Sequence, residues 1–208
     1  MNNKSGRFIV TRHHESVWNK TGRWTGIKDV GLTEYGKEMA VKMGKFLKGQ
    51  SIDRVVCSDL IRTHETLNGI LKGMEVLEIP IQMSSEFKER DYGDYTGKNK
   101  AEMEKIFGKE KYNCVRREWD CEIPNGETLK MVFNRMVPYY QKNIIPDLVS
   151  GQNILLVSHG NTIRALIKYI ENIPDTQIRF VEMPLGTIIF YEVDEKGLML
   201  SKELFEIE

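Results

Sequence analysis

Residues 153–161 read Asn-Ile-Leu-Leu-Val-Ser-His-Gly-Asn, a run of apolar residues that gives way to polar ones. The four consecutive apolar residues at 154–157 are typical of a strand that is buried on both faces. The following segment, 161–170, carries apolar side chains at the spacing of one helix face, namely Ile163, Leu166, Ile167 and Ile170. A buried strand that leads directly into an amphipathic helix is the repeating unit of an α/β fold.

The same alternation of strands and helices continues along the rest of the chain. Buried strands are predicted at 8–10 and 53–58, and closing strands at 186–193 and 198–205. Helices are predicted at 33–47, 60–71, 99–107 and 127–149, the last of them bent or broken near Pro138 and Pro146. No repeat or flexible linker interrupts the pattern, so we expect one domain over residues 1–208, an α/β sandwich around a mostly parallel sheet.

The composition limits the classes of function. The 208 residues include 30 Lys and Arg and 30 Asp and Glu, so the net charge is zero and a broad nucleic-acid surface is not expected. The apolar runs are too short to span a bilayer, and the polar start of the chain leaves no room for a signal peptide. We therefore expect a cytoplasmic protein that contacts no membrane. The three cysteines, Cys57, Cys114 and Cys121, match no metal-site spacing and are expected to be reduced thiols.

Two histidines follow predicted strands at the points where the strands end. His13 follows the first strand, and His159 follows the strand quoted above. Ligands bind beyond the carboxyl ends of strands in such sheets, so both histidines are expected at one ligand-binding edge. A single histidine there is more often a packed core residue, but arginines accompany these two, as Arg12, Arg62 and Arg164. Arginines and histidines with few carboxylates nearby suit an anion better than a cation, which predicts a phosphate ligand and no metal.

A series of motifs resembles those of a known enzyme family. Segment 12–16, Arg-His-His-Glu-Ser, is similar to the R-H-G-E-S signature of the histidine phosphatase superfamily. Further motifs follow in the order found in its 2,3-bisphosphoglycerate-dependent mutases: Trp24-Thr25-Gly26, Glu89-Arg90-Asp91-Tyr92-Gly93, Gly97-Lys98-Asn99-Lys100, Arg116-Arg117, Pro124-Asn125-Gly126-Glu127-Thr128 and Ser158-His159-Gly160-Asn161-Thr162. The first motif alone would indicate only the superfamily, whereas the ordered set resembles a compact form of these mutases.

The resemblance implies a three-layer sandwich with helices on both faces of the sheet, and it implies roles for individual residues. His13 is expected to accept a phosphoryl group, and Glu89 to move a proton to or from the substrate hydroxyl. Arg12, Arg62 and His159 are expected to surround that phosphoryl group. Substrate-binding roles are expected for these three groups of residues: Arg12, Ser16, Asn19, Thr25, Gly26 and Arg62; Glu89, Arg90, Tyr92 and Lys100; Arg116, Arg117, Gly160 and Asn161.

The implied reaction is the interconversion of 3-phosphoglycerate and 2-phosphoglycerate, with 2,3-bisphosphoglycerate as the phosphoryl primer. The family suggests a homodimer, although compact members could be monomeric. A phosphomonoesterase of the same superfamily is one alternative, since water would then take the phosphoryl group from His13. An inactive relative that only binds phosphorylated ligands is another. The phosphatase is disfavoured by Lys100, Arg116 and Arg117. The inactive relative is disfavoured by the intact Arg12, His13, Glu89 and His159.

Two of the positions that depart from the family pattern bear on the expected phosphate site. His14 stands where glycine is usual, and its ring could crowd the phosphate or point away from it. Glu118 follows the arginine pair in place of a small polar residue and is expected to add negative charge near the anion pocket.

Overall fold

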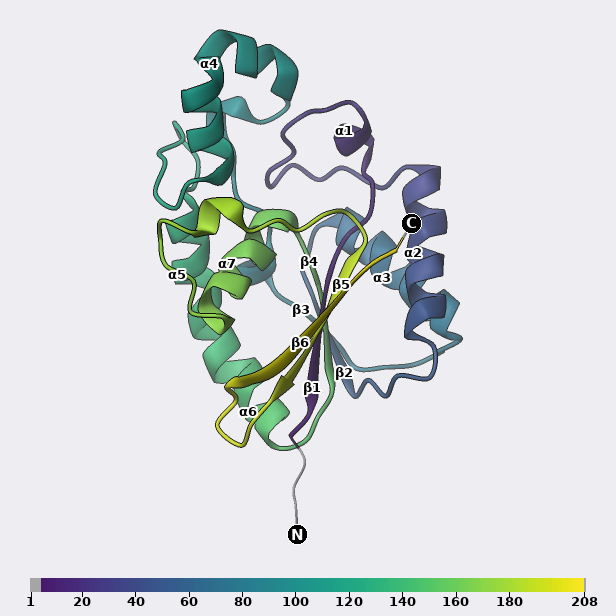
Figure 1. The fold of residues 1–208 in the computed structure, drawn as a ribbon. Coiled ribbons are helices and arrows are strands. Elements are labelled where there is room, and N and C mark those ends of the chain that lie inside the picture. The colour runs from purple at the N-terminus through teal and green to yellow at the C-terminus, as the bar shows by residue number, and fades with distance from the viewer. Residues whose placement is uncertain (1–4, 208) are drawn as a thin grey trace.

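A six-stranded sheet forms the centre of the computed structural model, which describes residues 5–207. The strands are β1 (Arg7–Arg12), β2 (Arg54–Cys57), β3 (Ile81–Met83), β4 (Ile154–Ser158), β5 (Thr187–Val193) and β6 (Met199–Glu206), in the order β3-β2-β4-β1-β5-β6 (Figure 1). All neighbours from β3 to β1 are parallel, whereas β5 pairs antiparallel with both β1 and β6. Only β5 among these strands runs against the others, so the prediction of a mostly parallel sheet is confirmed.

The register between β1 and β4 brings the two histidine-bearing turns together. Arg12 lies opposite Ser158 at the carboxyl ends of these strands. The backbone N–H of His13 then donates a hydrogen bond to the Ser158 carbonyl at 3.0 Å. His13 and His159 therefore leave the sheet side by side at one edge, as the sequence predicts.

Helices cover both faces of the sheet (Figure 1). On one face, α2 (Glu34–Leu47) and α3 (Ile61–Met74) pack against strand residues such as Ile9. On the other, α5 (Leu129–Tyr139), α6 (Ile145–Val149) and α7 (Gly160–Ile170) pack against residues such as Phe8 and Val10. Successive side chains of a strand point to opposite faces, so β1 contributes to two separate cores. The three-layer sandwich is confirmed.

The predicted helix starts all lie within two residues of those in the structure, whereas one predicted end, at 107, lies ten residues too early. The Thr33 hydroxyl caps α2 by accepting a hydrogen bond from the Gly36 N–H at 3.0 Å. Helix α4 (Lys100–Arg117) begins one residue from its predicted start but continues well past the predicted end at 107. Gly108 interrupts it with a φ of 75°, a conformation that glycine adopts without strain, and so ends the first helical pattern in the sequence.

The segment predicted as one bent helix at 127–149 consists of three pieces. Helix α5 is followed by a π-helical turn, η3 (Tyr140–Ile144), and then by α6. Pro138 lies just before the π-helical turn, and its missing N–H removes one backbone hydrogen bond there. The predicted break is confirmed. The short edge strand β3 was not predicted, because it follows Pro80 in a stretch without clear periodicity.

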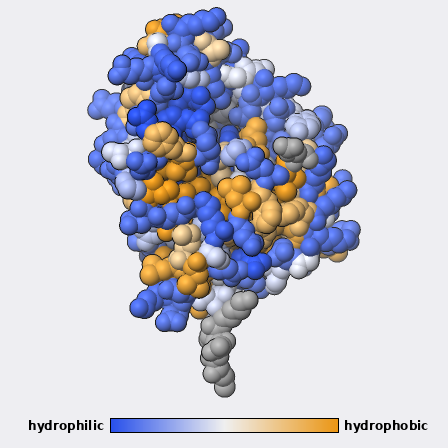
Figure 2. Space-filling model, in the orientation of Figure 1, coloured by the Kyte–Doolittle hydropathy of each residue, from blue (hydrophilic) through white to orange (hydrophobic). Residues whose placement is uncertain are grey.

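A cap lies over the carboxyl edge of the sheet and consists of α1 (Val17–Lys20), the turn η2 (Gly93–Tyr95) and α4 (Figure 1). It has a small core of its own, formed by Trp24, Tyr92, Met103, Tyr112, Val115 and Ile123. Figure 2 shows mostly hydrophilic side chains on the outside of this upper part of the molecule. The cap therefore buries its apolar side chains inward and roofs the edge at which His13 and His159 lie.

Cys114 and Cys121 form a disulfide bond, so the expectation of reduced thiols is wrong for these two residues. Cys114 lies in the last turns of α4, and the chain reverses after Arg117, which brings the two Cα atoms to 5.6 Å. The spacing of the cysteines in the sequence does not reveal this reversal. Cys57 is free and buried in β2.

Residues 5–207 contain no helix that is long and apolar enough to cross a membrane. Within the same range, no group of three or more His, Cys, Asp or Glu side chains could hold a metal ion. The prediction about the polar start of the chain rests partly on residues 1–4, which lie outside the described residues.

Candidate active site

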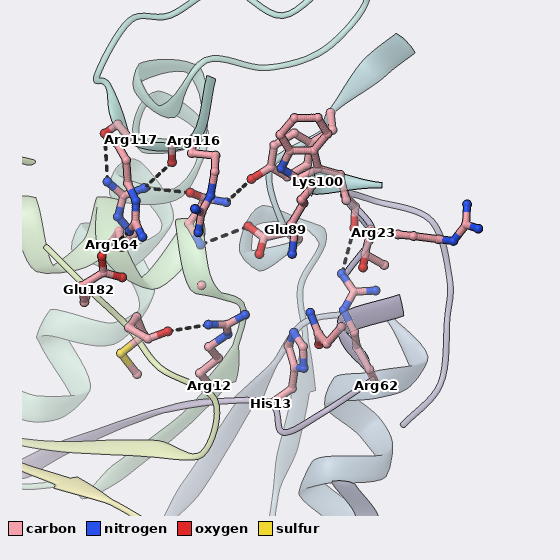
Figure 3. A pocket seen from close by; sticks show the side chains of 18 residues that line it. Arg12, His13, Arg23, Arg62, Glu89, Lys100, Arg116, Arg117, Arg164 and Glu182 are labelled. Atoms are coloured by element: carbon pink, nitrogen blue, oxygen red, sulfur yellow. Dashed lines mark hydrogen bonds and ion pairs between the residues drawn. The ribbon is translucent and has the colours of Figure 1, made fainter. Parts of the chain in front are cut away.

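A cavity opens at the carboxyl edge of the sheet, under the cap (Figure 3). Thirteen residues predicted from the sequence line it: Arg12, His13, Asn19, Thr25, Gly26, Arg62, Glu89, Tyr92, Lys100, Arg116, Arg117, Gly160 and Asn161. The other lining residues are Arg23, Trp24, Arg164, Glu182 and Met183. Seven of the lining side chains are Lys or Arg and two are Glu, so the cavity is strongly positive although the whole chain is neutral. Such a lining suits a ligand with several negative charges.

The orientation of His13 leaves one ring nitrogen available for chemistry. Its side chain is 2% exposed, and Nδ1 lies 2.7 Å from the carbonyl oxygen of His14. A carbonyl can only accept, so Nδ1 carries the proton and Nε2 keeps its lone pair. Burial lowers the pKa of His13 well below its ordinary value, and the charges of Arg62 and Arg12 lower it further. His13 is therefore neutral at pH 7, the form in which an imidazole can act as a nucleophile.

His159 lies behind the cavity wall and does not line it. Its Nδ1 accepts a hydrogen bond from Arg62 Nε at 3.2 Å, so Nε2 carries the proton and donates to Ser58 Oγ at 2.7 Å. The ring is fully buried, and burial followed by the charge of Arg62 lowers its pKa well below the ordinary value. His159 is thus a neutral support for the Arg62 guanidinium, which does line the cavity.

Arg62 is held from three sides. Besides His159, its guanidinium donates to the carbonyls of Lys28 at 3.0 Å and Gly26 at 2.8 Å. Gly26 has a φ of 55°, and a Cβ there would lie only 3.0 Å from the backbone nitrogen of Tyr92. Glycine therefore permits the tight turn that presents this carbonyl to Arg62.

Glu89 lies in the segment between β3 and α4, its carboxylate reaches the first turn of α7, and the residue is 8% exposed. Its Oε1 accepts hydrogen bonds from the backbone N–H groups of Arg90 at 2.9 Å and Asn161 at 3.1 Å. No hydrogen bond to Oε2 is seen among the described residues, and Figure 3 shows the carboxylate facing the cavity. One carboxylate oxygen is thus fixed while the other is available for a proton.

Cationic side chains from α4 line the side of the cavity away from His13 (Figure 3). They are Lys100 at the first turn of the helix and Arg116 and Arg117 at its last turn. Burial lowers the pKa of Lys100, and the nearby Arg12 and Arg116 lower it further. The Tyr92 hydroxyl lies next to them and accepts a hydrogen bond from Asn161 Nδ2 at 3.1 Å. The cavity therefore has two cationic ends, one at His13 and one under α4.

The sequence indicates Arg164 only as an arginine near a strand end and predicts no role for it. The residue is 4% exposed, and its guanidinium donates to the carbonyls of Arg116 at 3.2 Å and Arg117 at 2.9 Å. It also donates to the carbonyls of Ile178 and Val181, each at 2.9 Å. Arg164 thus joins the end of α4 to the chain that follows α7. Sequence reasoning missed its role, and it missed Arg23 and Glu182 altogether, although Arg23 directly precedes the Trp24-Thr25-Gly26 motif.

Two further predicted residues do not line the cavity and instead support others. Ser16 caps α1, and its Oγ lies 2.9 Å from Asn19 Oδ1 and so orients Asn19. Arg90 is fully buried and donates to the Tyr92 hydroxyl at 2.9 Å and to the Val115 carbonyl at 2.7 Å. Ser16 and Arg90 therefore contact residues that line the cavity but do not line it themselves.

The two departures from the family pattern lie outside the cavity. The His14 ring makes an edge contact with Tyr35, at 5.4 Å between ring centroids, and its Nδ1 accepts a hydrogen bond from its neighbour's N–H at 2.8 Å. His14 does not line the cavity. Its φ is not positive, because Glu75, Asn125 and Asn172 are the only residues other than glycine with positive φ among those described. The Glu118 carboxylate pairs with Arg179 at 3.1 Å, and neither residue lines the cavity.

Buried donors in the lining fit an anionic phosphoester. Arg12 Nε, Thr25 Oγ1 and Trp24 Nε1 are buried and have no hydrogen-bond partner among the described residues. A buried donor without a partner costs about 1–3 kcal/mol, so an anion that accepts from these atoms is stabilised. The donors belong to cavity residues, which is the chemistry expected of a phosphate and carboxylate site.

Comparisons with known proteins identify the family of the chain. Residues 8–203 match the histidine phosphatase superfamily, branch 1. The chain is 35% identical over 199 residues to a 2,3-bisphosphoglycerate-dependent phosphoglycerate mutase of Parvibaculum lavamentivorans, with 95% of each chain covered. It is 38% identical over 201 residues to a phosphoglycerate mutase of Schizosaccharomyces pombe, with 96% of this chain and 95% of the relative covered.

Solved structures have the same fold. Bacillus stearothermophilus YhfR is 26% identical, superposes with a TM-score of 0.82 and is matched over 94% of each chain. A mycobacterial glucosyl-3-phosphoglycerate phosphatase in complex with VO3 also has a TM-score of 0.82, over 98% of this chain and 100% of that one. At 20% identity the second likeness concerns the fold alone.

Proposed function

This chain belongs to the histidine phosphatase superfamily and, within it, to the phosphoglycerate mutase family, and from this membership we propose that it interconverts 3-phosphoglycerate and 2-phosphoglycerate through a phosphohistidine at His13. The observation that carries the proposal is the pair of cationic ends in one cavity. A phosphoglycerate carries a phosphate and a carboxylate, and these two anions match the two ends. The proposal includes a cytoplasmic location and a small-molecule substrate, and a homodimer remains a prediction.

His13 is the proposed nucleophile. Its Nε2 lone pair attacks phosphorus, the P–O bond to the substrate breaks, and a P–N bond to the ring forms. The hydrogen bond from Nδ1 to the His14 carbonyl keeps the ring in the tautomer that this step needs. Arg12 and Arg62 balance the negative charge on the phosphoryl oxygens as the bond changes, with Arg62 oriented by His159.

Glu89 is the proposed proton carrier. When the P–O bond breaks, the substrate oxygen needs a proton, and a protonated Glu89 supplies it. In the reverse direction the Glu89 carboxylate removes a proton from the hydroxyl that attacks phosphorus. The backbone donors from Arg90 and Asn161 hold one oxygen in place during both steps.

Lys100, Arg116 and Arg117 are proposed to bind the anion that does not react. Because they hold the far end of the glycerate, either hydroxyl can be turned toward His13 while the ligand stays bound. Bound 2,3-bisphosphoglycerate supplies the phosphoryl group that primes His13. The same cationic side chains would hold it, since it bears one more phosphate than the substrate.

A histidine-type phosphomonoesterase is the second candidate, because several solved structures with this fold are named as phosphatases. The cationic side chains of α4 favour the mutase, because hydrolysis of a phosphate ester does not require binding of a second anionic group on the substrate. A coupled assay that starts from 3-phosphoglycerate separates the two. Formation of 2-phosphoglycerate that depends on added 2,3-bisphosphoglycerate supports the mutase, whereas release of inorganic phosphate without 2-phosphoglycerate supports the phosphatase.

A further inference from the structure

We propose that Glu182 is a specificity-determining residue whose carboxylate occupies Arg117 in the free enzyme and is displaced by the non-reacting anion of the substrate. This inference rests on the proposed function, because it concerns the end of the cavity that binds that anion. Glu182 belongs to none of the sequence motifs that resemble the mutases. Its carboxylate competes with the ligand for Arg117 at the end of the cavity under α4. Glu182 therefore limits the affinity for phosphoglycerates and for more highly charged ligands.

The contact that suggests competition is an ion pair inside the lining of the cavity. Glu182 Oε1 lies 2.7 Å from Arg117 Nη1, and both residues line the cavity. Figure 3 shows Glu182 on the same side of the cavity as Arg117 and Arg164. A carboxylate is the group that a phosphoglycerate would present to an arginine at this end. Glu182 therefore makes with Arg117 the kind of contact that the ligand needs.

The backbone on both sides of Glu182 is fixed, whereas its side chain is not. Arg164 donates to the carbonyls of Ile178 and Val181, and Arg12 Nη1 donates to the carbonyl of Met183 at 2.5 Å. The Glu182 side chain is 60% exposed, against 23% for that of Arg117. The carboxylate can thus swing into solvent by side-chain rotation while the chain that carries it stays in place.

The energetics allow displacement. An ion pair with a largely exposed partner contributes little, because water solvates the freed carboxylate well. A substrate anion is tethered by its other contacts in the cavity and meets Arg117 at high effective concentration. The ligand therefore wins the competition, but its apparent affinity is reduced by the contact that it must break.

The chain offers a matched control in the ion pair between Glu118 and Arg179. This pair also joins the end of α4 to the chain after α7, with Glu118 Oε1 at 3.1 Å from Arg179 Nη1. Neither residue lines the cavity. Replacement of Glu118 by Gln removes one negative charge and one ion pair between these two segments, as replacement of Glu182 does. It leaves the contact between Glu182 and Arg117 in place.

Isothermal titration with 3-phosphoglycerate tests the proposal on the parent, Glu182→Gln, Glu182→Ala and Glu118→Gln proteins. Both Glu182 variants should bind 3-phosphoglycerate tighter by about two- to fivefold, the range of an exposed ion pair. The gain should be larger for 2,3-bisphosphoglycerate, since the Coulomb energy grows with ligand charge, and it should shrink at high salt. Inorganic phosphate, which fits the His13 end, should bind all four proteins within about twofold of one another.

Unchanged or weaker binding of 3-phosphoglycerate by both Glu182 variants overturns the inference, because it would make Glu182 a clamp that positions Arg117. Equal tightening by Glu118→Gln also overturns it, because the effect would then be one of overall charge. The proposed function fails in a different way: a parent protein that binds inorganic phosphate but not 3-phosphoglycerate contradicts both.

Discussion

The ring of His13 meets the ring of His159 edge to face, with 5.1 Å between the ring centroids. Each ring has one nitrogen in a hydrogen bond that fixes its tautomer, through the His14 carbonyl for His13 and through Arg62 for His159. Two imidazoles this close would repel one another if both were charged. Their contact is therefore a contact between neutral rings.

The first prediction concerns stability as a function of pH. Burial and the charges of Arg62 and Arg12 lower the pKa of both His13 and His159 in the folded protein. In the unfolded chain a histidine titrates near pH 6.5, so below about that pH the unfolded state binds protons that the folded state does not. Stability is therefore fully present above about pH 6.5 and is lost as the pH falls, by about 1 kcal/mol per histidine and pH unit.

Urea unfolding near pH 7.5 and near pH 5.5 measures this loss. A His13→Asn variant should lose less stability between the two pH values than the parent, because the contribution of His13 is removed while those of His159 and of His14, whose pKa burial also lowers, remain. Identical pH dependence of stability in the two proteins would show that the pKa of His13 is not lowered in the folded protein.

The second prediction separates the two ends of the cavity. Arg117→Ala should reduce mutase turnover about 10- to 100-fold, the loss of one charge-assisted contact of about 1.5–3 kcal/mol. Hydrolysis of a small phosphate ester, which does not reach Arg117, should change much less. Arg179→Ala is the control, since Arg179 does not line the cavity. Equal losses in the two assays for Arg117→Ala would contradict the division between the ends.

The third prediction concerns His14, whose ring packs on Tyr35 outside the cavity. His14→Gly should leave mutase turnover within about twofold, because His14 does not line the cavity. The free energy of unfolding should fall by about 1–3 kcal/mol, since a 5% exposed side chain is lost from a packed site. A fall of tenfold or more in turnover, about 1.4 kcal/mol in the activation free energy, would mean that His14 takes part in catalysis.

The fourth prediction concerns the disulfide between Cys114 and Cys121, which encloses Arg116 and Arg117. Reduction should lower the free energy of unfolding by about 2–3 kcal/mol, the loop entropy for a crosslink of this length. It should also raise the KM for 3-phosphoglycerate, because the arginine pair loses a local restraint. A Cys114→Ser/Cys121→Ser double variant should show both changes from the start and no further response to dithiothreitol. A response to dithiothreitol in that variant would point to another cause.

The sequence supports much of this fold because its signals are local. The apolar run at 154–157 and the helix spacing that follows it depend on neighbours in the chain, and both predicted elements are present. The approach of His13 to His159 follows from the general rule that parallel strands end at one edge. Five of the seven cationic lining residues are predicted from the sequence as site residues, and Arg23 and Arg164 are not. The roles of the five remain predictions.

The features that the sequence could not predict are contacts between segments that are brought together only by the folding of the chain. The disulfide needs the reversal after Arg117, and the role of Arg164 needs the chain after α7 to pass beside the end of α4. The contact of Glu182 with Arg117 arises from the same return. His159 could be placed at the correct edge, but only the packing around Arg62 shows that it lies behind the lining.

The most direct measurement is to follow a labelled phosphoryl group. The parent protein is incubated with 2,3-bisphosphoglycerate labelled in its phosphates, and label bound to the protein is tested for release by acid, as expected of a phosphohistidine. We predict an acid-labile label that maps to His13, is absent from His13→Ala and persists in His14→Ala. Label that survives in His13→Ala, or that maps to another residue, would contradict this prediction.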